Sequence, residues 1–423
     1  MNEFALLAEY PPEGSFSGGD WHANRCLFKN AEDLDMAMMK RYQTYLEQLA
    51  QRNGLRKLRN ARTDGNEIVF NGQTVLNLSS NDYMGIGSDT ALWQSFLGEE
   101  ARRGDFGGGA CSSRLLTGNH PAYASLENKL AERYGSESAL VFDSGYHANV
   151  GILPALASSR DLILADKLVH ASLIDGIRLS PAECVRFRHN DLAQLESILD
   201  KRRGSYEHVF IVTESVFSMD GDTADLRRLV ELKKKYDCLL YVDEAHAIGV
   251  RGACGLGLAE ELDIRAGIDL LVGTFGKAVA SQGAFVVCNR TLREYLVNTM
   301  RPLIFSTALP PASVRWTEFA LTHLMGRNNE RNDLAGMSAR LRGNLAAAGL
   351  KTAGTSHIVP LIVGDNTKAV RLSEYLCGNG FFVLPIRTPT VPAGSERLRF
   401  SLTTGVTENH IDKITALCKA FGK

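Results

Sequence analysis

The chain has 423 residues, of which 44% are hydrophobic and 22% are charged, and its formal net charge is -1. This composition is typical of a soluble globular protein. The near-zero net charge gives no broad electrostatic field that would attract nucleic acid or anionic lipid, and no apolar run is long enough to cross a bilayer. Because the length exceeds the roughly 250 to 300 residues at which a single core stops growing, we expect more than one packed region.

The first segment, residues 1–38, is expected to form an irregular tail. Pro11, Pro12 and Gly14 interrupt any helical period there. Apolar residues then recur at helical spacing from Met39 through Leu49, which predicts a helix. We assign residues 39–90 to this helix and to small strands.

From about residue 120, helical stretches alternate with short runs of β-branched and aliphatic residues. Unbroken apolar runs indicate strands buried on both faces, and helices between them indicate crossovers, so the pattern predicts an α/β fold with a mainly parallel sheet flanked by helices. The expected strands are residues 139–142, 162–164, 209–212, 239–242, 270–272 and 284–287. Residues 91–310 are assigned to this large domain.

Beyond Pro310 and Pro311 the rhythm of the sequence changes. A long helical stretch is expected at residues 313–348, and the elements that should follow it are a strand at 358–363, a helix at 367–379 and strands near Phe382 and Arg399. This pattern predicts a smaller α+β region, which we assign to residues 311–423.

Polar residues directly follow three of the expected strands. Parallel sheets bind ligands beyond the carboxyl ends of their strands, so these side chains are expected to meet in one crevice. The residues are Thr213, Glu214, Ser215 and Ser218, then Asp243 and His246, then Thr274 and Lys277.

This set of side chains suits an imine-forming pyridine cofactor, pyridoxal 5'-phosphate (PLP). Lys277 can attack an aldehyde if desolvation lowers the pKa of its amine. A carboxylate such as Asp243, about 4 Å from the pyridine nitrogen, favours protonation of that nitrogen by roughly 4 kcal/mol at an effective dielectric near 20. His246 is suited to donate a hydrogen bond to the phenolic oxygen of the ring. Ser218 and Thr274 are suited to hold the phosphate.

An ATP or dinucleotide site is the main alternative on these residues alone. An Asp after a strand is also a common helix cap, and a lysine after a glycine is also a common solvated loop residue. However, the sequence contains no GxxxxGK[ST] motif, and the GDFGGG segment at residues 104–109 does not follow an expected strand as a nucleotide fingerprint should. Both interpretations stay open at this point.

Six motifs occur in the order typical of one family. The chain resembles the α-oxoamine synthase family of fold type I PLP enzymes over about residues 40–420. The motifs are SSNDY at 79–83, SRLLTGNH at 113–120, DKLVHAS at 166–172, TESVFSMDGD at 213–222, VDEAH at 242–246 and TFGK at 274–277.

The resemblance implies a role for each matching residue. Lys277 is similar to the Schiff-base lysine, Asp243 to the partner of the pyridine nitrogen, and His170 to a histidine stacked on the ring. Further cofactor contacts are implied for Gly145, Tyr146, Ser218, His246, Thr274, Ser306 and Thr307, and substrate contacts for Arg56, Asn81, His170, Thr390 and Arg399. The segment with Ser306 and Thr307 resembles one that reaches the phosphate of a neighbouring subunit, which implies a homodimer with interfacial active sites. No metal is expected.

The family joins an amino acid to an acyl thioester and releases CO2. The segments PIRTPTVP at 385–392 and LIVGDN at 361–366 resemble the members that use L-alanine with pimeloyl-CoA, or a pimeloyl carrier protein, in biotin biosynthesis. Thr388 departs from the usual proline. Other members that use glycine with acetyl-CoA or serine with a fatty acyl-CoA are alternatives, followed by an aminotransferase or a non-catalytic module of this fold.

The eight cysteines form no CxxC pair and are expected to be reduced. No basic stretch followed by an apolar run opens the sequence, which favours a cytoplasmic location. Neither nucleic acid nor a membrane is expected as a partner.

Overall fold

The computed structural model describes residues 31–56, 58–104 and 107–422. The chain divides into two compact units at residue 58. In the first unit, helix α1 spans Ala31–Gln51. The helix predicted from Met39 therefore begins earlier, and residues 31–38 are helical rather than part of a tail, because they contain strong helix formers and no glycine or proline. The irregular structure expected for residues 1–30 lies outside the described residues.

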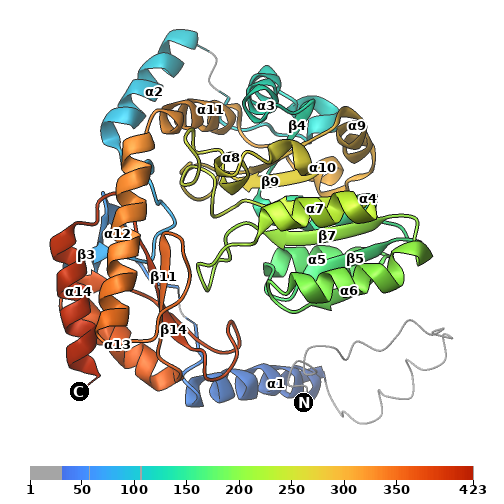
Figure 1. Cartoon of the computed structure of the whole chain (residues 1–423). Coiled ribbons are helices and arrows are strands. Elements are labelled where there is room, and N and C mark those ends of the chain that lie inside the picture. The colour runs from blue at the N-terminus through green and yellow to red at the C-terminus, as the bar shows by residue number, and fades with distance from the viewer. Residues whose placement is uncertain (1–30, 57, 105–106, 423) are drawn as a thin grey trace. The chain divides into compact units, whose positions relative to one another are not determined.

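A seven-stranded sheet with the order β4-β10-β9-β8-β7-β5-β6 lies at the centre of the second unit (Figure 1). Strands β5 to β9 are mutually parallel, whereas β10 runs antiparallel to both β4 and β9. The sheet is therefore mainly parallel, as predicted. The strands are β4 Ser138–Phe142, β5 Leu162–Asp166, β6 Glu183–Phe187, β7 Val209–Glu214, β8 Leu239–Asp243, β9 Leu270–Thr274 and β10 Ala284–Cys288.

The strand that the sequence did not reveal is β6, at the edge of the sheet. Its sequence, ECVRF, places charged residues among apolar ones, and most of its residues are exposed or half-buried. The other strands are buried along nearly their whole length. Burial explains the uninterrupted apolar runs of these strands, including β4 at the opposite edge, and the exposure of β6 explains why it has none.

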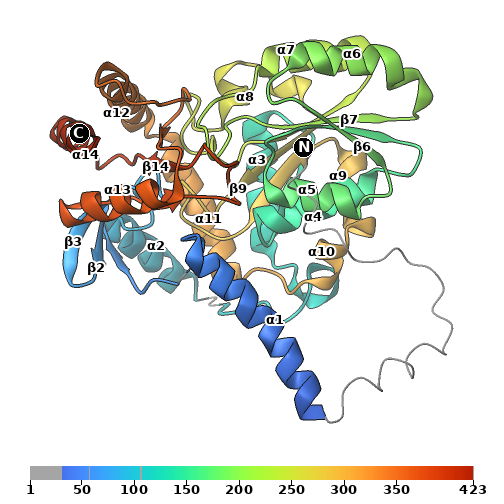
Figure 2. The same ribbon diagram turned by 90° about the horizontal axis from the view of Figure 1, so that it is seen from below.

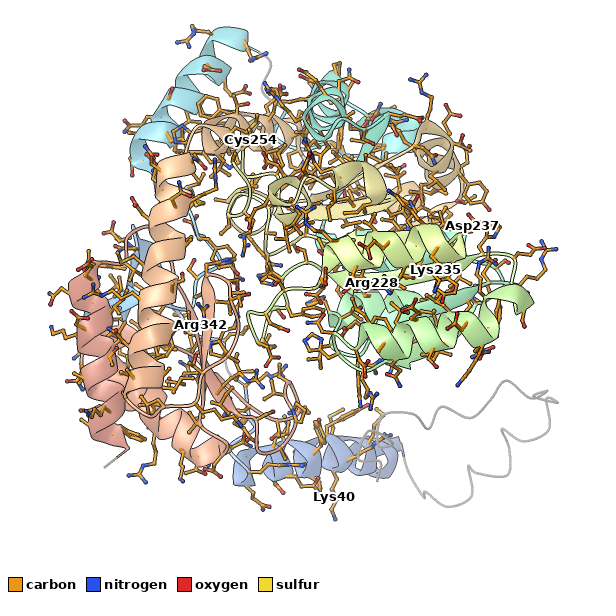
Figure 3. The ribbon with its side chains drawn as sticks, viewed as in Figure 1. Lys40, Arg228, Lys235, Asp237, Cys254 and Arg342 are labelled. Atoms are coloured by element: carbon orange, nitrogen blue, oxygen red, sulfur yellow. The ribbon has the colours of Figure 1, made fainter. Side chains whose placement is uncertain are left out.

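Helices cover both faces of this sheet. Figure 2 shows α6 (Leu192–Arg202) and α7 (Leu226–Tyr236) on one face, and α4 (Gly145–Leu156) and α5 (Ala171–Leu179) on the other. Leu226, Leu229 and Val230 of α7 are buried. On the outer side, Arg228 and Lys235, labelled in Figure 3, both pair with Glu196 of α6, at 2.7 and 2.8 Å.

Two smaller sheets accompany the large one. One has the order β1-β2-β3-β12 and the other β11-β14-β13. Their strands are β1 Arg62–Asp64, β2 Glu67–Phe70, β3 Gln73–Asn77, β11 Ile358–Ile362, β12 Phe381–Phe382, β13 Pro385–Ile386 and β14 Arg397–Ser401. The parallel pairing of β3 with β12 joins segments that we assigned to different domains, and those domain boundaries stay a prediction.

The long helical stretch predicted at residues 313–348 consists of two helices, because the chain turns at Gly326 and Arg327. The remaining elements of the C-terminal half are α8 Leu258–Glu261, η5 Arg265–Gly267, α9 Arg290–Thr299, α10 Arg301–Phe305, α11 Pro311–Met325, α12 Asn328–Ala347, α13 Asn366–Gly378 and α14 Glu408–Phe421. Those of the N-terminal half are α2 Thr90–Arg103, η3 Arg114–Gly118, α3 Pro121–Tyr134 and η4 Arg203–Ser205.

For the described residues, the structure bears on the expected lack of a membrane span and on the expected reduced state of the cysteines. Among the described helices, none is long and apolar enough to span a membrane. Every cysteine in the described ranges is a free thiol.

Helices α4 and α5 approach each other closely at a glycine. A Cβ atom on Gly176 of α5 would lie 2.2 Å from the carbonyl oxygen of Asn149 in α4. This distance is far below van der Waals contact and the neighbouring atom is backbone, so no side chain fits without a shift of one helix. The contact thus fixes the position of Asn149.

We expect Gly176→Ala to lower the free energy of unfolding by about 1 to 3 kcal/mol, because the new methyl group forces the two helices apart. Gly336→Ala is the matched control, since Gly336 lies inside α12 with open space around it. That change should raise stability by up to about 1 kcal/mol through helix propensity. Urea denaturation measures both, and equal midpoints for Gly176→Ala and the wild type would contradict the packing argument.

Candidate active site

Four adjacent strands of the large sheet have a polar residue at their carboxyl end. They are Thr274 on β9, Asp243 on β8, Glu214 on β7 and Asp166 on β5. All four side chains are buried. The convergence of polar groups that the sequence predicted is therefore confirmed, and it extends one strand further, to β5.

Lys277 lies in the loop that follows β9, and its amine joins this group. Burial lowers the pKa of Lys277 to about 8, although Asp243 and Glu214 lie near enough to favour the charged amine. A pKa near 8 leaves about a tenth of the amine unprotonated at pH 7, several hundred times more than for an ordinary lysine. The unprotonated amine is the form that attacks a carbonyl.

Asp243 is held by two hydrogen bonds that fix its carboxylate. Asn149 Nδ2 donates to Oδ2 and the Ala245 N–H donates to Oδ1, both at 2.8 Å. The Tyr241 hydroxyl in turn donates to Asn149 Oδ1 at 2.6 Å and orients the amide. Sequence reasoning missed Asn149, although an asparagine within the otherwise apolar helix α4 was a signal for it.

His170 caps the N-terminus of α5. Its backbone N–H donates to Glu214 Oε1, and its Nδ1 lies 2.7 Å from Ser172 Oγ. The imidazole is solvent accessible, yet burial against the protein, helped by the charge of Lys277 and opposed by Asp243, lowers the pKa of His170. At neutral pH the ring is therefore uncharged, which suits stacking on an aromatic cofactor.

His246 is buried behind Tyr83, with 2.7 Å between His246 Nδ1 and the Tyr83 hydroxyl. Burial, together with the charges of Lys277 and Arg399, lowers the pKa of His246 well below its ordinary value. The Tyr83 hydroxyl also lies 2.9 Å from Asn81 Oδ1. Tyr83, which we did not single out from its motif, thus connects two residues that we did.

Arg399 on β14 is surrounded by neutral acceptors. Its guanidinium donates to Ser218 O at 2.5 Å and to Ser401 Oγ at 2.7 Å, and more distantly to Asn81 Oδ1 and Tyr83 Oη, at 3.3 and 3.2 Å. By contrast, Arg397 on the same strand pairs with the carboxylate of Asp220 at 2.5 Å. Since no described partner of Arg399 is an acid, its charge is available for a carboxylate ligand.

The N-terminus of α4 lies beside the end of β9. A Cβ atom on Gly145 would lie 3.4 Å from Thr274 Oγ1, and Ser144 caps the helix. N–H groups in the first turn of a helix have no partner within it and attract anions such as phosphate. Tyr146 is half-exposed, and its hydroxyl donates to Asp175 Oδ2 at 2.6 Å. With the amine of Lys277 and the carboxylate of Asp243, this anion site fits PLP.

Four further residues were predicted to contact the cofactor or the substrate. Ser306 lines a small cavity with Asp143 and His147, and Thr307 and Thr390 are exposed. Arg56 belongs to the first unit. The contacts assigned to these four residues stay predictions.

Known proteins are similar to this chain in sequence. Residues 73–417 match the family model described as aminotransferase class I and II. The putative 8-amino-7-oxononanoate synthase of Neisseria gonorrhoeae is 51% identical over 384 residues, which cover 89% of this chain and 100% of the relative. The 8-amino-7-oxononanoate synthase of Chlorobaculum parvum is 51% identical over 360 residues, covering 84% and 92%.

Solved structures agree with the family match. A serine palmitoyltransferase variant from S. paucimobilis with bound PLP superimposes with a TM-score of 0.81 at 31% identity, covering 92% of this chain and 98% of that chain. The 8-amino-7-oxononanoate synthase of Francisella tularensis gives a TM-score of 0.70 at 29% identity, covering 82% and 97%.

The lowered pKa of Lys277 predicts how cofactor-free protein combines with PLP. The rate should rise about tenfold per pH unit at lower pH and level off near pH 8, because only the unprotonated amine reacts. Stopped-flow absorbance measures this rate, and Lys277→Ala should give no lysine-bound band at any pH. A rate that keeps rising to about pH 10, as for an ordinary lysine, would contradict the assigned environment.

Proposed function

Since the chain belongs to the aminotransferase class I and II family, we propose that it catalyses the PLP-dependent condensation of L-alanine with a pimeloyl thioester to 8-amino-7-oxononanoate, CO2 and the free thiol carrier, a step of biotin biosynthesis. The resemblance to α-oxoamine synthases, the fold type I architecture and the PLP cofactor, all predicted from the sequence, are confirmed by the relatives. The chain is a PLP-dependent acyl-transferring enzyme.

One observation carries the choice of reaction. Two relatives named 8-amino-7-oxononanoate synthase are 51% identical over nearly their whole length. The two solved structures, a serine palmitoyltransferase at 31% identity and an 8-amino-7-oxononanoate synthase at 29%, do not separate the two activities. The shared fold and cofactor residues do not distinguish between members of the family. The identity of 51% to the two named relatives therefore supports L-alanine and a pimeloyl group over serine and a fatty acyl group.

Each residue of the site has a proposed role in this reaction. When bound, PLP supplies the aldehyde that captures the amino group and the ring that accepts the electron pair left at Cα. We propose that Asp243 holds the pyridine nitrogen protonated and that Arg399 binds the carboxylate of L-alanine. The Lys277 amine, with its pKa of about 8, then removes the Cα proton as a general base near neutral pH.

The neutral histidines complete the site. We propose that His170 packs an uncharged ring against the cofactor; its backbone N–H donates to Glu214 Oε1. We propose that His246 donates a hydrogen bond to the phenolic oxygen through Nε2. Its Nδ1 then accepts from the Tyr83 hydroxyl, which turns from Asn81 Oδ1 to His246. The first-turn N–H groups of α4, at Gly145 and Tyr146, and the Thr274 hydroxyl hold the phosphate.

We also propose that the enzyme is a homodimer with active sites at the interface. Leu115, Leu116 and Phe305 are exposed large hydrophobic residues. Their segments adjoin each other, because the Ala308 N–H donates to Ser112 O at 2.9 Å. An apolar surface of this kind is typical of a protein interface, and it lies next to Ser306 and Thr307, the residues expected to reach the partner's cofactor.

The reaction is tested by thiol release from pimeloyl-CoA in the presence of L-alanine. We expect the highest kcat/KM for this pair, and at least a thousandfold loss in Lys277→Ala, which lacks both the covalent anchor and the general base. Parallel assays with glycine plus acetyl-CoA and with serine plus palmitoyl-CoA serve as controls. A higher kcat/KM for either control pair would overturn the proposed substrates while leaving the PLP site intact.

The interfacial site is tested by subunit mixing. Lys277→Ala and the double variant Ser306→Ala with Thr307→Ala should each be inactive or weakly active alone. After dissociation and reassociation of an equal mixture, random pairing gives heterodimers with one fully intact site, so activity should recover to about a quarter of the wild-type value. No recovery, with heterodimers confirmed by mass spectrometry, would place both sets of residues in the same subunit's site.

A further inference from the structure

A histidine outside the cofactor site lies between two carboxylates. His189, in the loop after β6, has Nδ1 2.9 Å from Asp166 Oδ1 and Nε2 2.7 Å from Asp222 Oδ2. Carboxylates only accept hydrogen bonds, and a neutral imidazole has a single N–H. Both contacts are therefore satisfied together when the ring is an imidazolium.

The surroundings of the ring favour this charge. Burial opposes it, but hydrogen bonds and attraction from Asp166 and Asp222 outweigh that cost and raise the pKa of His189 to about 10. The ring also packs edge-on against Phe217, with 4.4 Å between ring centroids. His189 is thus a fixed cation at neutral pH rather than a titrating group.

The two carboxylates belong to two loops of the active site, the loop that leads to His170 and the loop that contains Ser218. Asp166 begins the loop that leads to His170, and its Oδ1 accepts from the Leu168 N–H at 2.8 Å. Asp222 closes the loop that contains Ser218, because its carbonyl accepts from the Phe217 N–H at 3.0 Å. The carbonyl of Ser218 in turn accepts from Arg399 Nε.

The neighbouring residue reinforces the same connection. The backbone N–H of Asn190 donates to Asp166 Oδ2 at 2.8 Å, and its side-chain amide donates to Asp222 Oδ2 at 3.0 Å. Asn190 has a φ of 53°, a left-handed conformation that asparagine tolerates better than most residues. The pair of residues therefore ties both loops at one point through side chains and backbone.

We propose that His189 is a positioning residue of the active site, which joins the loop of His170 to the loop of Ser218 and thereby sets the placement of Arg399 for the amino-acid carboxylate. The ring bridges Asp166, the last residue of β5, to Asp222, which lies in the loop after the adjacent strand β7. Without the ring, the connection made by this pair of residues depends on Asn190. The inference depends on the proposed function in one respect, that Arg399 binds the carboxylate.

The test compares His189→Gln with a matched control, His208→Gln. His208 also contacts a buried aspartate, with 3.0 Å between its Nδ1 and Asp161 Oδ1, but it lies at the opposite ends of β5 and β7. His189→Gln removes the contacts with Asp166 and Asp222, whereas His208→Gln removes the single contact with Asp161. Asp222→Asn is a second variant that keeps the size of the side chain and removes one charge.

Hydrogen exchange of the holoenzyme reads out the bridge directly. In His189→Gln, amides of residues 166–170 and 217–222 should exchange at least about tenfold faster than in the wild type, and His208→Gln should leave both segments unchanged. Asp222→Asn should accelerate the same segments. Unchanged exchange in both His189→Gln and Asp222→Asn would overturn the proposal.

Amino-acid binding reads out the consequence. Titrated by the absorbance change of the bound cofactor, the L-alanine dissociation constant should rise about tenfold or more in His189→Gln, the size found for outer-shell partners, with KM for the acyl thioester nearly unchanged. Wild-type affinity for L-alanine in a His189→Gln holoenzyme with faster loop exchange would reduce His189 to a purely structural role. Exchange rates do not depend on the substrate, so failure of the proposed reaction in the wild type is distinguishable from failure of this inference.

Discussion

The burial of one lysine amine beside two carboxylates is the constraint on which the rest of the site depends. Glu214 and Asp243 face each other in the register of β7 and β8. Burial, together with the neighbouring charge of Asp243, raises the pKa of Glu214 well above its ordinary value. Two adjacent acids thus take different roles: Glu214 holds the backbone of His170, and Asp243, fixed by Asn149 and Ala245, supplies the negative charge.

Helix α4 supports this arrangement at two of its positions. Its N-terminus provides the anion site beside Thr274, and one turn later Asn149 orients Asp243. In the proposed function, this one helix would serve both the phosphate and the pyridine nitrogen of PLP. The close packing of α5 at Gly176 fixes the distance of this helix from the next one, so a core contact contributes to the precision of the cofactor site.

The sequence predicted those parts of the structure that depend on local pattern. Apolar runs predicted the buried strands. The rule that parallel sheets bind ligands at the carboxyl ends of their strands then indicated Asp243 at the end of β8 and Lys277 shortly after β9. Asn149 and Tyr83 were not singled out, and Glu214 was expected at the site without a role, because their importance arises from contacts between residues distant in sequence. The pairing of β3 with β12 was missed for the same reason. Edge strand β6 had no apolar run to detect.

The two arginines of β14 show how the protein prepares a charge for its substrate. Arg397 and Arg399 lie two residues apart and so point to the same face of the strand. The loop of residues 217–222 contacts both, through Asp220 for Arg397 and through the Ser218 carbonyl for Arg399. A half-buried guanidinium with only neutral acceptors keeps part of its desolvation cost uncompensated. If Arg399 binds the amino-acid carboxylate as proposed, that carboxylate removes this cost. Amino-acid affinity would then depend on a loop that gives Arg399 only a neutral carbonyl while it neutralises Arg397.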